Sequence, residues 1–213
     1  MTRSRRAAVE AVATALLLAA VVGSGIMGER LSGGSVGLAL LANSAATGAA
    51  LVALILALGA HMNPVVTLSE AWRRSLPWAD VPALVAAQVV GAVLGVAAAN
   101  AMFDLPVFSI SEHARRGGSQ LLSESIATFG LLLVVIRVRE PTATALSVGG
   151  YIAAAYWFTA STSFANPAVT AARALSDTFA GIRPADVAGF VGAQLVGAAA
   201  ATGFCLWLGV TDE

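Results

Sequence analysis

The sequence holds two short polar motifs in apolar surroundings, Asn63-Pro64-Val65 and Asn166-Pro167-Ala168, and each is followed by Val-Thr. Asn is favoured as the cap of a helix N-terminus. Pro is favoured just inside it, because Pro there loses only an N–H that would have no partner anyway. Both motifs therefore predict helix starts. Two such starts at matching places would bring two positive helix ends and two donating amides to one point, which suggests a pore.

The elements that must hold these motifs are apolar. The chain has 213 residues, of which 58% are hydrophobic and 11% charged, with a mean hydropathy of +0.82. That is too apolar for a soluble domain. Six stretches approach the roughly 20 residues that span a hydrocarbon core: 7–27, 36–58, 81–103, 121–138, 142–158 and 187–210. We expect an all-α membrane protein of six transmembrane helices, with re-entrant half-helices starting at the two motifs.

The two halves of the chain repeat one another. The segment from Glu10 resembles the segment from Glu124, and Ala-Gln-Val-Val-Gly-Ala around Gln88 matches Ala-Gln-Leu-Val-Gly-Ala around Gln194. Each half holds three spans, an odd number, so the second half must enter the membrane from the opposite side. We expect one transmembrane domain over 1–213, with inverted repeats 7–103 and 120–210 joined by an extracellular loop, 104–119.

The charged residues predict which side of the membrane each loop faces, but they predict no charged partner. The twelve basic residues are all Arg and balance twelve acidic residues, without the basic tract that nucleic acid would need. No His and Cys cluster has the spacing of metal ligands, so we expect neither metal nor cofactor. A cytoplasmic N-terminus follows the positive-inside bias, and we expect both termini in the cytoplasm of a cell (plasma or inner) membrane. The arginines then facing inward are Arg3, Arg5, Arg6, Arg73, Arg74, Arg137 and Arg139.

From Glu10 to the last helix, the chain resembles the aquaporin and glycerol-facilitator channels, the major intrinsic proteins. The resemblance rests on the two motifs in register, His61 ahead of the first, and the Glu and Gln pairs. It implies half-helices that meet at the bilayer centre, a homotetramer with one pore per subunit, and Asn63 and Asn166 donating to the permeating molecule. The helix ends would also oppose proton passage. The expected pore centre is Asn63, Pro64, Val65, Asn166, Pro167 and Ala168.

Two residues depart from the pattern of this family. Val65 replaces the usual Ala, which we interpret as a packing variation. Val169 stands where most water-selective members carry Arg. Arg173 lies one helical turn, about 5.4 Å, further on. Two interpretations of it remain: it guards the outer vestibule, or it faces solvent or lipid headgroups.

The remaining filter positions follow by alignment with the family. They are Ser163, Ala154 and, in the second helix, Thr47, with Ala46 as an alternative because the loop after residue 58 is short. Together with Val169 these residues would make an uncharged constriction wider than a strict water filter. We expect a channel for water and small uncharged solutes: glycerol-like polyols, urea or neutral metalloid hydroxides such as arsenite.

Glu10 and Glu124 lie inside predicted spans, where a carboxylate is a functional candidate. The resemblance implies that they brace the re-entrant loops, with Gln88 and Gln194 beside them. His61 would line the cytoplasmic approach or hold its loop, or act as a pH gate. A proton-coupled secondary transporter using Glu10 and Glu124 is the alternative, although nothing else in the spans could bind a charged substrate. We expect no enzyme, because Ser24 between two glycines has no partner His in any span.

Overall fold

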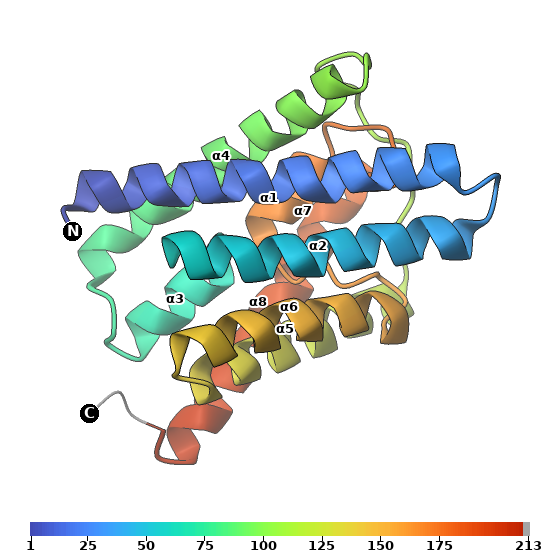
Figure 1. The fold of residues 1–213 in the computed structure, drawn as a ribbon. Coiled ribbons are helices and arrows are strands. Elements are labelled where there is room, and N and C mark those ends of the chain that lie inside the picture. Colours follow the sequence, from blue (N-terminus) through green and yellow to red (C-terminus); the bar gives the residue numbers. More distant parts are fainter. Residues whose placement is uncertain (211–213) are drawn as a thin grey trace.

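The computed structural model describes residues 1–210, and its elements are helices (Figure 1). Two short helices, α3 (Pro64–Trp72) and α7 (Pro167–Arg173), start at the predicted motifs, and the 3-10 turn η1 (Trp78–Asp80) precedes α4. The long helices are α1 (Arg3–Leu31), α2 (Val36–Leu58), α4 (Val81–Met102), α5 (Gly118–Arg137), α6 (Pro141–Phe158) and α8 (Pro184–Trp207). The predicted all-α architecture is confirmed for the described residues.

The helix boundaries follow local signals. The predicted second span coincides with α2, because the Ser35 hydroxyl caps its start and Gly59, with a left-handed φ of 60°, ends it. The last helix begins three residues before the predicted 187, since Pro184 occupies its first position. It ends at Trp207 rather than 210, just ahead of the left-handed Gly209.

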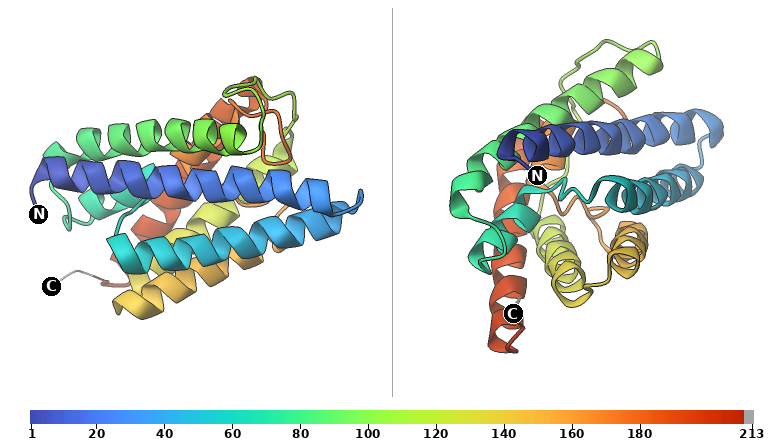
Figure 2. Two further views of the ribbon diagram at one scale, coloured as in Figure 1. Left: turned by 45° about the horizontal axis from the view of Figure 1, so that its top comes forward. Right: turned by 60° about the vertical axis from the view of Figure 1, so that its left-hand side comes forward.

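Within residues 1–210, five helical segments are long and apolar enough to cross a membrane: α1, α2, Trp78–Met102, α5 and α8. The predicted fifth span, α6, is not among them. It has 18 residues and carries polar side chains, such as Thr142, Thr144 and Ser147. Even so, α6 packs against α2 and α5. Both ends of the described chain lie on the same side of the bundle, as six crossings require (Figures 1 and 2). Large apolar side chains cover its exterior, as in an integral membrane protein.

Glycine allows the paired long helices to approach closely. A Cβ at Gly91 or Gly95 on α4 would lie 2.2 Å from a backbone carbonyl oxygen of α1, that of Ala11 or Ala15. In the second half, a Cβ at Gly197 on α8 would lie 2.3 Å from the carbonyl oxygen of Ser125 on α5. The α1–α4 and α5–α8 pairs thus use small residues in the same way, as helices in lipid do.

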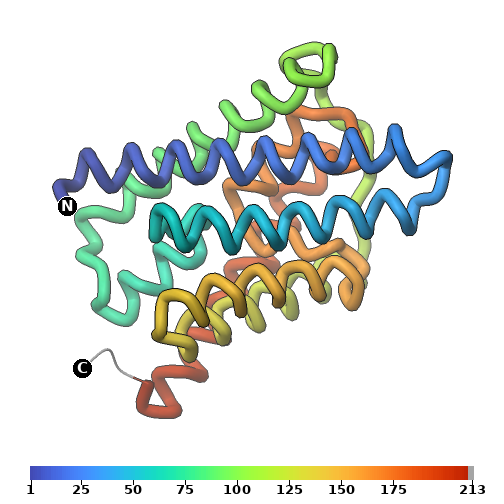
Figure 3. The backbone as a smooth tube through the Cα atoms, in the orientation of Figure 1, coloured from blue at the N-terminus to red at the C-terminus, as the bar shows by residue number. Residues whose placement is uncertain are grey.

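The half-helices α3 and α7 start near the middle of the bundle and run away from each other, and the tube in Figure 3 shows both. Loops 103–117 and 174–183 cover the end of the bundle opposite the chain termini (Figure 1). The linker between the halves runs over 103–117 rather than the predicted 104–119, since α4 ends at Met102 and α5 already begins at Gly118. The apolar core surrounds the two helix starts.

Candidate pore and its lining

Asn63 and Asn166 cap the half-helices with their side-chain oxygens. Oδ1 of Asn63 accepts from the N–H of Val65 at 3.1 Å. Oδ1 of Asn166 accepts from the N–H groups of Ala168 and Val169, at 3.0 and 3.3 Å. A Pro follows each Asn in the first helical position. The predicted helix starts are confirmed.

The side-chain nitrogens of the same two residues join the halves of the protein. Nδ2 of Asn63 donates to the carbonyl oxygen of Ala165 at 2.8 Å, and Nδ2 of Asn166 donates to that of Met62 at 2.7 Å. Each half-helix start is therefore fastened to the loop in front of the other. A primary amide carries two N–H groups, so each Asn keeps one beyond this bond.

Two buried carboxylates hold the loops that precede the motifs. Met62 and Ala165 have left-handed φ angles of 53° and 47°, a conformation that costs on the order of 1–3 kcal/mol for a residue with a side chain. Glu10 accepts from the N–H groups of His61 and Met62, at 2.7 and 2.8 Å. Glu124 accepts from the two equivalent N–H groups of the second loop, each at 2.9 Å, those of Phe164 and Ala165. These bonds give the irregular backbone partners that lipid cannot supply.

A glutamine side chain binds each of these two carboxylates. Nε2 of Gln88 donates to Glu10 at 2.8 Å and to the Thr67 hydroxyl at 2.9 Å. The same pattern recurs in the second half, where Nε2 of Gln194 donates at 2.6 and 2.8 Å to Glu124 and Thr170. The four residues that the sequence pairs as Glu and Gln thus lie in matching networks behind the two half-helices.

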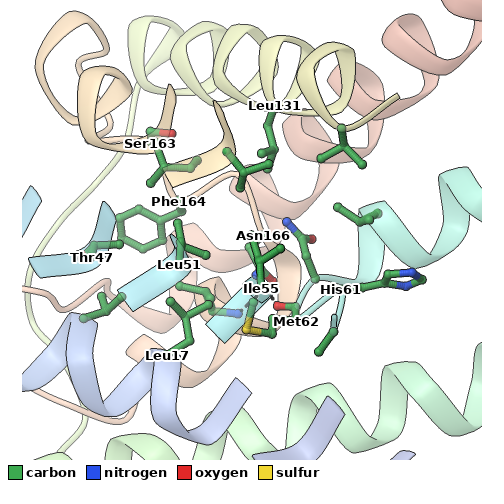
Figure 4. A pocket seen from close by; sticks show the side chains of 18 of the residues that line it. Leu17, Thr47, Leu51, Ile55, His61, Met62, Leu131, Ser163, Phe164 and Asn166 are labelled. Carbon is green, nitrogen blue, oxygen red and sulfur yellow. Dashed lines mark hydrogen bonds between the residues drawn. The ribbon is translucent and has the colours of Figure 1, made fainter. Parts of the chain in front are cut away.

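A cavity of about 200 Å³ passes both Asn residues. Figure 4 shows His61 at one end, Met62 and Asn166 midway, and Thr47, Ser163 and Phe164 at the other end. We call this second end the α7 mouth; its residues are Thr47, Tyr156, Ser163, Phe164, Val169 and Arg173.

Not every residue expected at the pore centre reaches the cavity. Val65 and Ala168 are buried in the core beside it, and Pro64 and Pro167 start the half-helices without lining it. His61 does line it, and its Nδ1 lies 3.0 Å from the hydroxyl oxygen of Thr67.

Ala154 does not belong to the cavity wall. Its side chain is exposed, whereas Ile152 and Tyr156 of the same helix line the cavity. Residues two apart on a helix do not face the same way, so the alignment with the family chose the wrong face of α6. A signal for the correct face was present: Val148, Ile152 and Tyr156 recur every four residues.

The hydroxyl groups of the α7 mouth differ in how they are bonded. The Oγ1 of Thr47 and the phenolic oxygen of Tyr156 lie 3.2 Å apart, within hydrogen-bonding distance. The buried Oγ of Ser163 has no partner among residues 1–210. Val169 supplies an apolar surface and is 5% exposed. This lining offers hydroxyl groups and no ionised group except Arg173.

Arg173 lies at the cavity rather than in solvent or at headgroups. It is 2% exposed and lines the α7 mouth. Its Nε donates to the carbonyl oxygen of Ala180, and its guanidinium carbon lies 3.4 Å from the centroid of the Phe164 ring. Within residues 1–210 it forms no salt bridge, and its two Nη groups make no hydrogen bond. The vestibule interpretation of this residue agrees with its position.

Arg115 is a second buried cation at this end, and no motif in the sequence marks it, because it lies in the linker. Its guanidinium carbon is 4.9 Å from the centroid of the same Phe164 ring. Burial lowers the pKa of Arg115 to about 10, so the side chain is still charged at neutral pH.

Six long helices around two opposed half-helices, with a cavity that passes both helix starts, define an aquaporin-like membrane fold. The chain belongs to the major intrinsic protein family, whose model matches residues 1–145. It is 51% identical over 212 residues to the aquaglyceroporin AqpS of Rhizobium meliloti (strain 1021), covering 96% of this chain and 90% of that one.

More distant relatives agree with this assignment. The glycerol uptake facilitator protein of Bacillus subtilis (strain 168) is 32% identical over 92 residues, which cover 38% of this chain and 34% of that protein. Among solved structures, the aquaglyceroporin from Plasmodium falciparum superposes with a TM-score of 0.75 over 96% of both chains. Its sequence identity is 16%, so this match supports the fold alone.

Proposed function

We propose that this protein is a passive channel for water and small uncharged solutes, with glycerol-like polyols, urea and neutral metalloid hydroxides such as arsenite as its candidate permeants. The observation that carries the proposal is the α7 mouth, where Val169 occupies the position at which most water-selective members of the family place Arg. The names of the relatives AqpS and the glycerol uptake facilitator support solutes of the glycerol type.

The two Asn residues supply the central step of permeation. Each has one N–H that is not needed for the bond to the opposite loop, and each lines the cavity. A permeating oxygen would accept from these N–H groups. The positive ends of α3 and α7 meet at the same place, and their potential opposes a proton or a cation in the water file.

The α7 mouth sets the size and charge of the permeant. Thr47, Ser163 and Tyr156 offer hydroxyl groups to a hydroxylated solute, while Val169 leaves the space that a filter Arg would fill. Arg173 is a cation at the same mouth and has donors that no protein group occupies within residues 1–210. It would repel small cations without narrowing the constriction as an Arg at residue 169 would.

The contacts of Glu10 and Glu124 support a passive channel over a proton-coupled transporter. Each carboxylate accepts two backbone N–H groups and one Gln amide N–H. Each carboxylate is therefore bonded to the loop before a half-helix and to the Gln behind it. The two acids would brace loops rather than carry protons.

The assembly and orientation belong to the same proposal. We propose inverted repeats 7–103 and 120–210 in one channel domain, with both termini in the cytoplasm and a homotetramer in the cell (plasma or inner) membrane. The equivalent bonds of Glu10 and Glu124 support the repeat. Seven of the twelve arginines, the ones expected to face inward, lie at the start of α1 or at the ends of α3 and α5, and this excess supports the orientation.

Stopped-flow light scattering of proteoliposomes tests the proposal directly. Vesicles with purified protein and matched empty vesicles would be mixed with osmolytes, and water, glycerol, urea and arsenite permeabilities recorded in parallel. We expect water flow and entry of at least one of the three solutes, without any ion gradient. Water flow with no solute entry would reject the wide filter, and no flow of either kind would reject the channel.

A further inference from the structure

Arg115 lies in the loop between α4 and α5, away from both Asn-Pro motifs, yet it is only 9% exposed. Its Nε donates to the carbonyl oxygen of Gly181 at 2.8 Å, and its Nη2 to that of Phe179 at 3.4 Å. Its Nη1 donates to the carbonyl oxygen of Ser161 at 3.3 Å and, at 3.5 Å, to the Thr162 hydroxyl. One guanidinium therefore ties together two segments of chain that precede and follow α7.

These two segments are the ones that orient Arg173. The Nε of Arg173 donates to the carbonyl oxygen of Ala180, between the two carbonyls that Arg115 binds. The guanidinium of Arg173 stacks on Phe164, two residues after the segment that Arg115 holds on the other side. Arg115 thus lies beside both contacts that fix the position of the Arg173 guanidinium, the bond to Ala180 and the ring of Phe164.

The segment before Phe164 needs such an anchor. Thr162 and Ser163 have left-handed φ angles of 61° and 50°, which are unfavourable for residues with side chains. Glu124 holds this loop only from Phe164 onward. On the other side of the two left-handed residues, Gln120 and Ser123 bond Ala160, and Arg115 bonds the carbonyl oxygen of Ser161 and the hydroxyl of Thr162. Arg115 is the one of these three that also binds the segment after α7.

The loop around residue 115 is also held by hydrogen bonds that do not involve the Arg115 side chain. The backbone N–H of Arg115 donates to the carboxylate of Asp186 at 2.8 Å. The carbonyl oxygen of His113 accepts from the N–H of Arg183, also at 2.8 Å. Further back, the N–H of Ser109 donates to the carbonyl oxygen of Leu175 at 3.0 Å. Replacing the side chain should therefore alter the α7 mouth while the loop stays in place.

We infer that Arg115 is a positioning residue of the pore: it sets where the guanidinium of Arg173 stands at the α7 mouth, and through it how strongly the channel rejects small cations. The inference rests on the proposed function, since it concerns selectivity in a conducting channel. Arg115 itself does not line the cavity.

The test is a double-mutant cycle on cation selectivity. Arg115→Met, Arg173→Met and the double variant would be reconstituted, and the ratio of methylammonium to water permeability measured for each. We expect Arg115→Met to raise this ratio about fivefold, a size of coupling found between residues that share partners. In the Arg173→Met background the same change should add little. Equal effects in both backgrounds would overturn the inference.

Arg116→Met is the matched control, because Arg116 is the exposed neighbour in the same loop; it should leave the ratio at the wild-type value. If Arg115→Met does not fold, Arg115→Lys carries the test, since Lys cannot make the forked set of bonds. A Lys variant with the wild-type ratio would reject the inference. If wild-type vesicles conduct neither water nor solute, the proposed function fails instead, and the two failures are distinguishable.

Discussion

The Nδ2 of Asn63 donates a hydrogen bond at 2.8 Å to the carbonyl oxygen of Ala165, 102 residues further along the chain. The reverse bond, from Asn166 to Met62, is 2.7 Å long. Each Asn therefore has two separable tasks, since its oxygen caps its own helix and its nitrogen holds the opposite loop. Substitutions that change only one of these atoms can tell the tasks apart.

Asn63→Asp keeps the capping oxygen but replaces the N–H donors with a second carboxylate oxygen, which faces the carbonyl oxygen of Ala165 and can only accept. We expect it to lower the free energy of unfolding by about 1–3 kcal/mol, because the carbonyl oxygen of Ala165 is left buried without a donor. Asn166→Asp should cost a similar amount through Met62. Denaturant unfolding in detergent measures both. Two variants as stable as the wild type would show that these crossing bonds do not stabilise the fold.

Val169→Arg tests the filter. The larger Arg side chain should narrow the α7 mouth. We expect glycerol and urea permeability to fall about tenfold or more, while water still passes. Val169→Leu adds bulk without charge and separates size from electrostatics. The measurement is stopped-flow swelling of proteoliposomes. If the Arg variant conducted water and its solute permeability were unchanged, the filter would lie elsewhere.

Glu10→Gln separates bracing from proton coupling. The carboxylate accepts three N–H groups, and we expect stability to fall, since a bond to a charged group contributes about 1.5–3 kcal/mol. Protein that still folds should equilibrate solute without an ion gradient, as the wild type should. Solute flux that requires a proton gradient in the wild type and disappears in this variant would favour the transporter.

Gly197→Ala tests the close contact of α5 and α8. The new Cβ would lie 2.3 Å from the carbonyl oxygen of Ser125, so the helices must separate and the melting temperature should fall. Gly192→Ala on the same helix is the control. A Cβ added at Gly192 has no neighbour within 4 Å, so this variant should have the wild-type melting temperature or a slightly higher one. Equal melting temperatures for the two variants would contradict the close approach of these two helices.

Glu140 gives the α5–α6 corner a pH dependence. Its carboxylate accepts from the N–H groups of Thr142 and Ala143, at 2.9 and 2.5 Å, and these bonds lower its pKa from 4.5. Because the pKa of Glu140 is lower in the folded protein than in the unfolded chain, its ionised form stabilises the fold. This stabilisation is complete above the pKa of the unfolded chain and is lost as the pH falls through the pKa of the folded protein. Thermal unfolding should therefore separate wild type from Glu140→Gln at pH 7, and the difference should shrink as the pH falls below the ordinary pKa of 4.5. A pH-independent difference would contradict this.

The sequence by itself determined the class of the protein. Hydrophobic length predicted the long helices, because a span in lipid must satisfy its own backbone. Asn-Pro predicted the half-helix starts, since capping is a local property, and the repeat paired Glu10 with Glu124 and Gln88 with Gln194. All of these signals are contained in a few neighbouring residues or in a comparison of the two halves.

Only the tertiary structure decided which side chains face the cavity. Ala154 and Tyr156 differ by two positions, yet they point to opposite sides of α6, so the alignment with the family placed the expected wall on the outer face. The position of Arg173 depends on a ring and a carbonyl from two other segments. The contacts of Arg115 depend on loops more than 40 residues away in sequence. Such contacts arise from packing between distant segments, which no local pattern encodes.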